Sequence, residues 1–147
     1  MDHVDDGRVA YDKLCAMHFV TETGLRGRCI QDVVTKPHRK WARMQFENGH
    51  VEWNCAVRGG VDLVTADLPD GNAVSEEISK TRPDDFIAEL THIADALASG
   101  GPSPLDIERG LDTMLVIAAA HLSDQRKATV RINYDKGYTP AALEVLA

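Results

Sequence analysis

Apolar and polar residues alternate with the two-residue period of β-strands along the first half of the chain. Residues 10–20 (AYDKLCAMHFV) carry apolar side chains on both faces, which predicts a central strand, and residues 27–35 (GRCIQDVVT) predict its return strand after the turn ETGL. Residues 61–78 (VDLVTADLPDGNAVSEEI) predict two shorter strands around a Pro-Asp-Gly-Asn turn. We therefore expect strands over about residues 8–78.

The segment WARMQFENGHVEWN (41–54) has the clearest local pattern, that of a β-hairpin. Asn48-Gly49 is a dipeptide favoured in a two-residue type I′ turn, because both positions need positive φ. A loop at these residues predicts four cross-strand pairs: Glu47 with His50, Phe46 with Val51, Gln45 with Glu52, and Met44 with Trp53. One face is then apolar and packs on a core. The other face, which meets water or a polar interface, carries Arg43, Gln45, Glu47, His50 and Glu52.

The apolar positions change to a helical period after residue 80. A first helix is expected over about residues 84–98, with Thr81 and Asp84 in a capping-box arrangement and Gly100 at its end. A second is expected over residues 104–126, with Ser103 as N-cap and Pro104 at the first helical position. Residues 128–134 (ATVRINY) predict a closing strand, and residues 139–147 (TPAALEVLA) a last short helix or a frayed tail.

Strands followed by two helices and a closing strand predict an α+β fold. The expected architecture is a mostly antiparallel, open-faced sheet with helices packed on one face. The length of 147 residues suits one domain with a sizeable core, and no repeat, low-complexity tract or linker interrupts it. We expect a single α+β domain over residues 1–147.

Charge and composition restrict the partners. A formal net charge of −7 argues against nucleic acid, because phosphate binding needs a basic face. No apolar run approaches the roughly 18 residues that cross a bilayer, and the start MDHVDDGR lacks the features of a secretory signal. The three cysteines, Cys15, Cys29 and Cys55, fit no zinc pattern and predict reduced, buried thiols in a cytoplasmic protein.

Motifs that carry chemistry are missing from the sequence. None of the six histidines belongs to an H-E-x-x-H motif, and no C-x-x-C is present. The glycine-containing stretches GLRG and RGGVD are not the G-x-G-x-x-G turn that a dinucleotide needs, and the Walker A and G-x-S-x-G motifs do not occur. We therefore expect no catalytic, cofactor-binding or metal-ligating residue on this chain.

Two longer stretches resemble the C-terminal domain of the Gfo/Idh/MocA oxidoreductases, the group of glucose-fructose oxidoreductase and inositol dehydrogenase. The first, GLRGRCIQDVVTKPHRKWARMQFENGHVEWN (24–54), is similar to the family's sheet, with Gly49 and Trp53 in its hairpin. The second, residues 84–132, is similar to the family's order of helix, Gly-Pro loop, helix beginning near Gly-Leu, and closing strand. The likeness covers about residues 5–135.

This resemblance implies a two-domain enzyme. A Rossmann domain would hold NAD(P), and the α+β domain would shape a sugar or polyol site and form subunit contacts through its open sheet. The family's catalytic lysine lies in a Glu-Lys-Pro motif and its acid/base histidine in an Asp-x-x-x-His motif. Here Thr35 precedes Lys36-Pro37, no histidine follows an aspartate by four residues, and the nucleotide-binding half is missing. We therefore interpret Lys36-Pro37 as a turn between strands.

The expected function is that of a C-terminal substrate-site and oligomerisation domain of an NAD(P)-dependent sugar- or polyol-type oxidoreductase. The chain would be a fragment or truncated product, not catalytic by itself, binding no cofactor and forming a homo-oligomer. The candidate oligomer-face residues are Arg43, Gln45, Glu47 and Glu52. One alternative is a stand-alone interaction module that self-associates through the same sheet face. Another is a small enzyme with a cavity between sheet and helices that uses His18 or His121, which converging ionisable side chains would favour.

Overall fold

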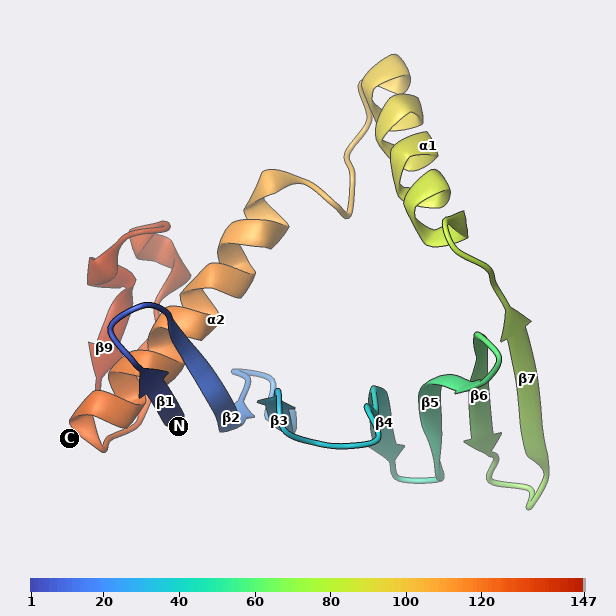
Figure 1. The fold of residues 1–147 in the computed structure, drawn as a ribbon, viewed down its shortest axis with the longest axis horizontal. Helices are drawn as coiled ribbons and strands as arrows, with labels where there is room; N and C mark the ends of the chain where they lie inside the picture. Colours follow the sequence, from blue (N-terminus) through green and yellow to red (C-terminus); the bar gives the residue numbers. More distant parts are fainter. Residues whose placement is uncertain (147) are drawn as a thin grey trace. The chain divides into compact units, whose positions relative to one another are not determined.

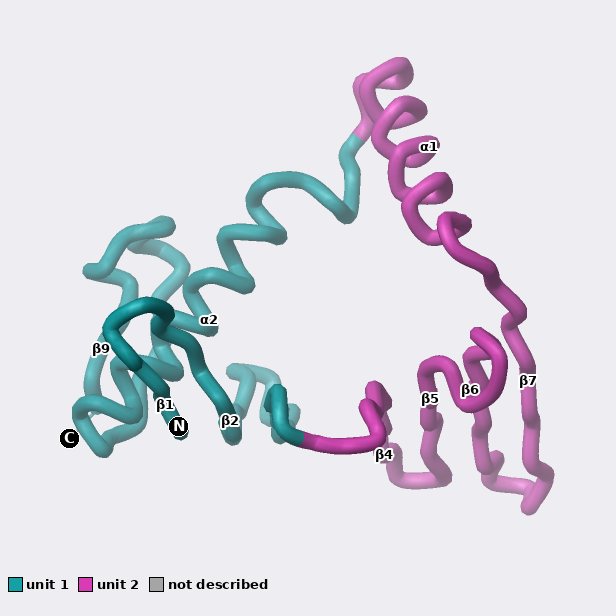
Figure 2. Tube along the Cα trace, viewed as in Figure 1, with its two compact units in different colours: residues 1–34, 102–147 teal, residues 35–101 magenta. Residues whose placement is uncertain are grey.

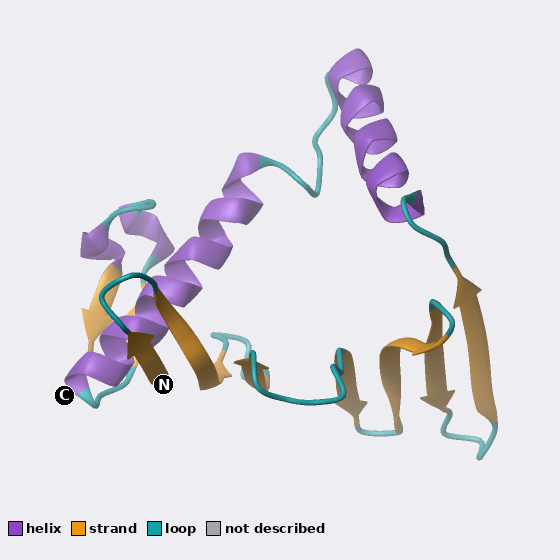
Figure 3. Ribbon diagram, viewed as in Figure 1, coloured by secondary structure: helices purple, strands orange, loops and turns teal. Residues whose placement is uncertain are grey.

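The structure, a computed structural model, describes residues 1–146 and has the α+β fold that the sequence predicts (Figures 1 and 3). Every strand pairing in the described residues is antiparallel. Residue 147, the last of the predicted tail, lies outside them. The strands and helices are β1 (Asp2–Asp5), β2 (Ala10–Val20), β3 (Arg26–Asp32), β4 (Trp41–Phe46), β5 (Gly49–Arg58), β6 (Val61–Asp67), β7 (Ala73–Ser79), α1 (Asp84–Ser99), α2 (Ile107–Arg126), β8 (Val130–Ile132) and β9 (Leu143–Val145).

The chain divides into two compact units, which Figure 2 colours separately. Unit 1 comprises Met1–Val34 with Pro102–Ala147, and unit 2 comprises Thr35–Gly101. The strands, expected in one sheet, divide among three: β1-β2-β3 and β8-β9 in unit 1, and β4-β5-β6-β7 in unit 2. A single domain over residues 1–147 stays a prediction.

The small core of unit 1 forms around α2. The β8-β9 ladder lies along this helix, as Figure 1 shows, and Leu115, Ala119 and Ala142 are buried. Strand β1, which the sequence pattern missed because it is short and charged, pairs with β2. The tail predicted to be a helix or frayed instead contains a 3₁₀ turn at Pro140–Ala142 and strand β9. Strand β9 pairs with β8, so the closing strand is one half of a ladder.

A β-bulge interrupts the pairing of β1 with β2. Asp2 pairs with Leu14, but the next residue, His3, pairs with Asp12, so Lys13 is an extra residue on β2. An extra residue reverses the side-chain alternation on one side of the bulge. Asp12 thereby shares the sheet face of Cys15 instead of the opposite one.

Unit 2 contains a four-stranded meander whose hairpin differs in register from the prediction. The last pair before the turn is Phe46 with Gly49, so the loop is Glu47-Asn48 and not Asn48-Gly49. Met44 pairs with Val51 and Arg43 with Glu52, a shift of two residues from the predicted pairs. The predicted division into two faces is retained, because a shift of two leaves the alternation unchanged.

The hairpin register has a steric reason at Gly49. A Cβ at this position would collide with the backbone carbonyl of Asp67, which ends the neighbouring strand β6. Two features require glycine at position 49: the backbones of β5 and β6 approach closely, and the residue has a φ of 148°. The dipeptide Asn48-Gly49 therefore marked a close approach between β5 and β6, and the sequence pattern attributed it to the turn.

The helices begin and end near the predicted residues, with a correction at each N-terminus. The N-cap of α1 is Pro83 and no side chain caps this helix, so only half of the predicted capping box forms: the Asp84 carboxylate accepts from the backbone N–H and the hydroxyl of Thr81, at 2.8 and 2.9 Å. Gly100 ends α1 in a left-handed conformation. Helix α2 begins at Ile107 and not at 104, because the N-cap is Asp106, whose side chain accepts from the N–H of Arg109 at 3.0 Å. The Ser103 hydroxyl instead accepts from the N–H of Leu105 in the preceding turn.

Candidate functional site

The four-stranded sheet has an uncovered apolar face. Alternation places on it, from β4 to β7, Ala42, Met44, Phe46, Val51, Trp53, Val64, Ala66, Val74 and Ile78, which we call the apolar face. Two carboxylates, Asp62 on β6 and Glu76 on β7, lie on the same face. Met44 and Phe46 are each 58% exposed, and Val74 and Ile78 are exposed as well. Within residues 35–101, all of which the structure describes, the one buried residue is Asp62.

The predicted oligomer-face residues lie on the opposite, polar face or in the turn. Arg43 donates to Gln45 at 3.1 Å, and its guanidinium lies 4.0 Å from the Glu52 carboxylate on β5. Glu47 is exposed in the hairpin loop, so the structure brings three of the four together and leaves Glu47 at the end. Exposed polar pairs of this kind stabilise little, and their role in subunit contact stays a prediction.

Helix α1 carries a second uncovered apolar surface in unit 2. None of its residues is buried. Its apolar stripe, with Leu97 80% exposed, consists of Phe86, Ile87, Leu90, Ile93 and Leu97. A helix with an apolar stripe ordinarily buries it against another element. The stripe and the apolar face of the sheet are therefore surfaces that need a covering partner.

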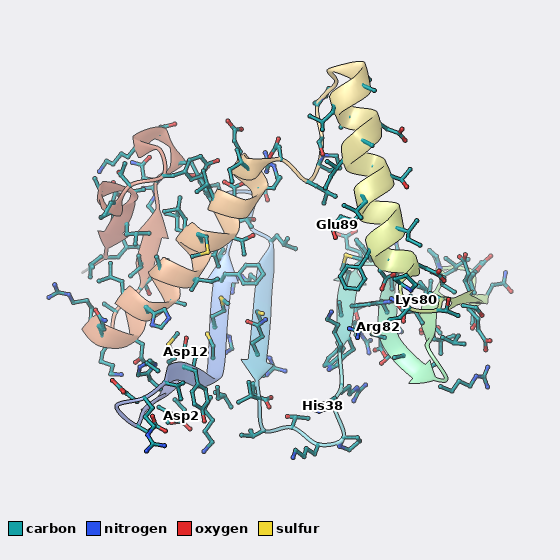
Figure 4. All side chains as sticks on the ribbon, turned by 45° about the horizontal axis from the view of Figure 1, so that its top comes forward. Asp2, Asp12, His38, Lys80, Arg82 and Glu89 are labelled. Carbon is teal, nitrogen blue, oxygen red and sulfur yellow. The ribbon has the colours of Figure 1, made fainter. Side chains whose placement is uncertain are left out.

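A buried carboxylate, that of Asp62 on β6, lies among the side chains of the apolar face. Asp62 is 5% exposed and accepts hydrogen bonds from the indole of Trp53 at 3.0 Å and the N–H of Ala56 at 2.9 Å, while the Lys80 ammonium lies 3.1 Å away. The Ala56 N–H chiefly lowers the pKa of Asp62 to about 2, helped by Lys80, Trp53 and the Cys55 thiol and opposed by burial. Every polar contact of this carboxylate is within the unit, so its role is structural. Lys80 lies near the start of α1 (Figure 4).

The segment around Lys36-Pro37 connects the two units and is not helical, as predicted. Of its basic residues, Arg39 lies over the Trp41 ring, 5.2 Å from the centroid, and donates to Asn54 at 3.3 Å. The arginine therefore anchors the end of this segment to the sheet, and the interpretation of Lys36-Pro37 as a turn without a catalytic role stays a prediction.

An aspartate and two histidines meet in unit 1. Asp12 on β2 has one carboxylate oxygen 2.9 Å from Nδ1 of His3 and the other 3.0 Å from Nε2 of His121 on α2. Figure 4 shows Asp12 beside the C-terminal part of this helix. Of the two histidines singled out from the sequence, His121 belongs to this group, whereas His18 is exposed on its strand.

A cavity of about 300 Å³ lies against this group, between the three-stranded sheet and α2. Its lining combines carboxylate, amide, sulfur-containing and aliphatic side chains: Met1, Asp12, Cys15, Met17, Gln31, Asp32, Val33, Ile117 and Ala120. Burial, followed by the nearby charge of Asp12, raises the pKa of the Cys15 thiol. Cys15 is therefore a neutral thiol near neutral pH. Cys15 and Cys55 are half-buried, but Cys29 is exposed, so the prediction of buried thiols is wrong for Cys29, which lies on the edge strand β3.

Within the described residues 1–146, no group of histidine, cysteine, aspartate or glutamate side chains has the arrangement of a metal site. No helix in that range combines the length and apolar character needed to cross a membrane. Comparison of the chain with protein-family models, curated proteins and solved structures gives no match.

Sequence reasoning missed both Asp12 and Asp62. The bulge that turns Asp12 toward α2 depends on pairing with β1, which no local pattern predicts. Asp62 carried a usable signal: alternation places it on the same strand face as Val64 and Ala66, among apolar side chains. A carboxylate on an apolar face needs donors, which indicates a structural hydrogen-bond group.

Proposed function

We propose that this chain is an assembly domain, in which the apolar face of the four-stranded sheet is covered by a second copy of the chain. The observation that supports this most directly is the exposure of Met44, Phe46, Val74 and Ile78 on one face of the sheet. Contiguous exposed apolar surface is the usual mark of a protein–protein contact.

The accessible surface area supports the same proposal. The chain exposes 11732 Å². Two separately folded bodies of the sizes of units 1 and 2 would together expose about 8,900 Å² by the usual scaling with mass. The excess of about 2,800 Å² is more than the roughly 800 Å² that each partner buries in a standard interface. Self-association would therefore bury surface that the individual units leave uncovered.

Within a larger protein, this assembly role suits the C-terminal domain of an NAD(P)-dependent sugar- or polyol-type oxidoreductase. The resemblance of residues 24–54 and 84–132 to the Gfo/Idh/MocA group, together with the α+β fold, supports this assignment. Catalysis would require a nucleotide-binding domain that places a nicotinamide against the substrate. The alternative is a stand-alone interaction module that self-associates through the polar sheet face of Arg43, Gln45, Glu47 and Glu52. A Rossmann-coding segment directly upstream of this reading frame would favour the oxidoreductase.

Sedimentation velocity across a range of protein concentrations tests the assembly role. The unmodified chain should sediment as an oligomer, and Met44→Lys on the apolar face should shift it to the monomer. Gln45→Lys is the matched control, because Gln45 is the next residue on β4, equally exposed, and points to the polar face. A chain that stays monomeric at all concentrations would refute the proposal, and dissociation by Gln45→Lys alone would assign the contact to the predicted polar face.

A further inference from the structure

The cavity in unit 1 has a carboxylate in its wall that two histidines hold in place. A carboxylate only accepts hydrogen bonds, so His3 must carry its proton on Nδ1 and His121 on Nε2 when each ring is neutral. The two rings come from β1 and α2 and engage different oxygens of Asp12. Three elements thus fix the position of this carboxylate, while each oxygen retains a further lone pair.

The size and lining of the cavity suit a small ligand with a polar end and an apolar body. Its volume of about 300 Å³ lies at the lower end of the range of small-molecule sites. At the roughly 30 Å³ that one water molecule occupies in the liquid, this is room for about ten non-hydrogen atoms. Met17, Val33 and Ile117 provide apolar surface, and the side chains of Asp12 and Asp32 provide carboxylates.

The charge of the cavity lining favours a cation. The fixed cations nearest to this part of unit 1 lie against carboxylates other than Asp12: the Met1 ammonium and the Lys127 amine share the Asp124 carboxylate, each at 3.1 Å, and the Lys13 amine lies 3.5 Å from Asp2. Asp12 contacts His3 and His121, whose imidazole rings carry no charge when unprotonated. Burial, followed by the charge of Asp12, raises the pKa of Cys15, and the Met1 ammonium opposes this shift; the direction agrees with a poorly solvated wall that contains the Asp12 carboxylate.

We propose that the unit 1 cavity binds a small organic cation, a primary ammonium on a short apolar body, through a charge-assisted hydrogen bond to Asp12. The ammonium donates to the carboxylate that His3 and His121 position, and the apolar body packs on Met17, Val33 and Ile117. This site is independent of the proposed assembly role, because it lies within unit 1 and the apolar face belongs to unit 2.

Three probes of one shape test the charge requirement: cyclohexylammonium, cyclohexanol and cyclohexanecarboxylate. Each is titrated into the full ¹⁵N-labelled chain and followed by amide chemical shifts. Cyclohexylammonium should give saturable shifts at residues around the cavity, and at least tenfold weaker effects are expected for the other two. Equal binding of cyclohexanol, preferential binding of the carboxylate, or no saturation with the ammonium would each overturn the proposal.

Two variants assign the site. Asp12→Asn should weaken cyclohexylammonium binding at least tenfold, whereas Asp2→Asn, the same charge change on an exposed residue of β1, should leave it unchanged within twofold. If Asp12→Asn loses the native amide spectrum, Ala120→Leu replaces it as the test of the site. This variant fills the cavity from α2 and leaves the carboxylate in place, and it should weaken cyclohexylammonium binding. Unchanged binding in the folded Asp12→Asn or in Ala120→Leu would refute the assignment.

Discussion

The indole Nε1 of Trp53 on β5 donates a hydrogen bond to Oδ2 of Asp62 on β6 over 3.0 Å. This contact ties a large aromatic residue of the apolar face to the one buried residue of unit 2. Both tryptophans of the chain, Trp41 and Trp53, belong to unit 2, and all three tyrosines belong to unit 1. Tryptophan fluorescence therefore reports the unfolding of unit 2, and the near-ultraviolet tyrosine signal reports unit 1.

Unit 2 should lose stability in acid through Asp62. Its pKa falls from the ordinary 3.8 to about 2 in the folded chain, so the folded state binds this proton less readily than the unfolded state. The stabilisation is complete above about pH 4 and is lost as the pH falls through 4 toward 2. Urea midpoints from tryptophan fluorescence should decline over this interval. In Asp62→Asn the urea midpoint should be lower at neutral pH, and it should decline less between about pH 4 and pH 2 than in the unmodified chain. The same pH profile in both proteins would contradict the assignment to Asp62.

Ala56→Gly should stabilise unit 2. Ala56 has a φ of 51°, a left-handed conformation that costs a residue with a Cβ roughly 1–2 kcal/mol. The greater flexibility of glycine in the unfolded chain offsets part of this gain, so the expected increase is about 0.5–1 kcal/mol in the free energy of unfolding. Ala66→Gly, in an ordinary strand conformation on β6, is the control and should destabilise. The two changes should have opposite signs in urea unfolding.

Gly49→Ala should destabilise unit 2 by roughly 2–3 kcal/mol, because the new methyl group collides with the Asp67 carbonyl and forces β5 and β6 apart. Gly59→Ala separates this steric effect from backbone conformation. Gly59 has a φ of 56° and open space at its Cβ position, so alanine there should cost only about 1 kcal/mol. Equal losses for the two variants, measured by tryptophan fluorescence, would show that the close approach is unimportant.

Asp106→Ala should destabilise unit 1 by about 1 kcal/mol, since it removes the side chain that caps the N-terminus of α2. Asn is an equally good N-cap, so Asp106→Asn should retain most of the stability. Thermal unfolding followed by the tyrosine signal measures both. A full loss in Asp106→Asn would mean that charge, rather than the hydrogen bond to Arg109, supplies the stabilisation.

The purified chain should not bind NADH or NADPH. A nicotinamide dinucleotide needs a glycine-rich turn between strand and helix to hold its pyrophosphate, and the sequence contains no such motif. Titration at micromolar cofactor should leave the nicotinamide fluorescence unenhanced. Saturable enhancement would require a nucleotide site that neither the motifs nor the resemblance place on this chain.

Local patterns predicted what depends on neighbouring residues. The α+β class, the two faces of the hairpin around Met44 and the left-handed end of α1 at Gly100 follow from alternation, helical period and glycine freedom. The hairpin register was wrong by two residues because Asn48-Gly49 was assigned to the turn, whereas Gly49 is the first residue of β5 and lies against the Asp67 carbonyl. The start of α2 was wrong because Ser103 and Asp106 are both good N-caps, and only the folded segment selects between them.

The candidate site depends on contacts between distant residues and was largely beyond prediction. His121 was one of two histidines considered, but its partner Asp12 lies more than a hundred positions earlier in the chain. Alternation alone would place Asp12 on the face opposite Cys15. The pairing of β1, a strand of four residues, determines its true orientation.

The contacts of Asp12 with His3 and His121 depend on one extra residue in β2, the bulge residue Lys13. With this extra residue in β2, Asp12 faces His121. Without it, the side chain of Asp12 would point to the other side of the sheet. Deletion or insertion of a single codon in this strand would therefore remove or create the contacts of Asp12 with His3 and His121, although none of these three residues would be substituted. Among natural variants of this chain, we expect the presence of both histidines to correlate with the presence of the extra residue in β2 more closely than with substitutions in that strand.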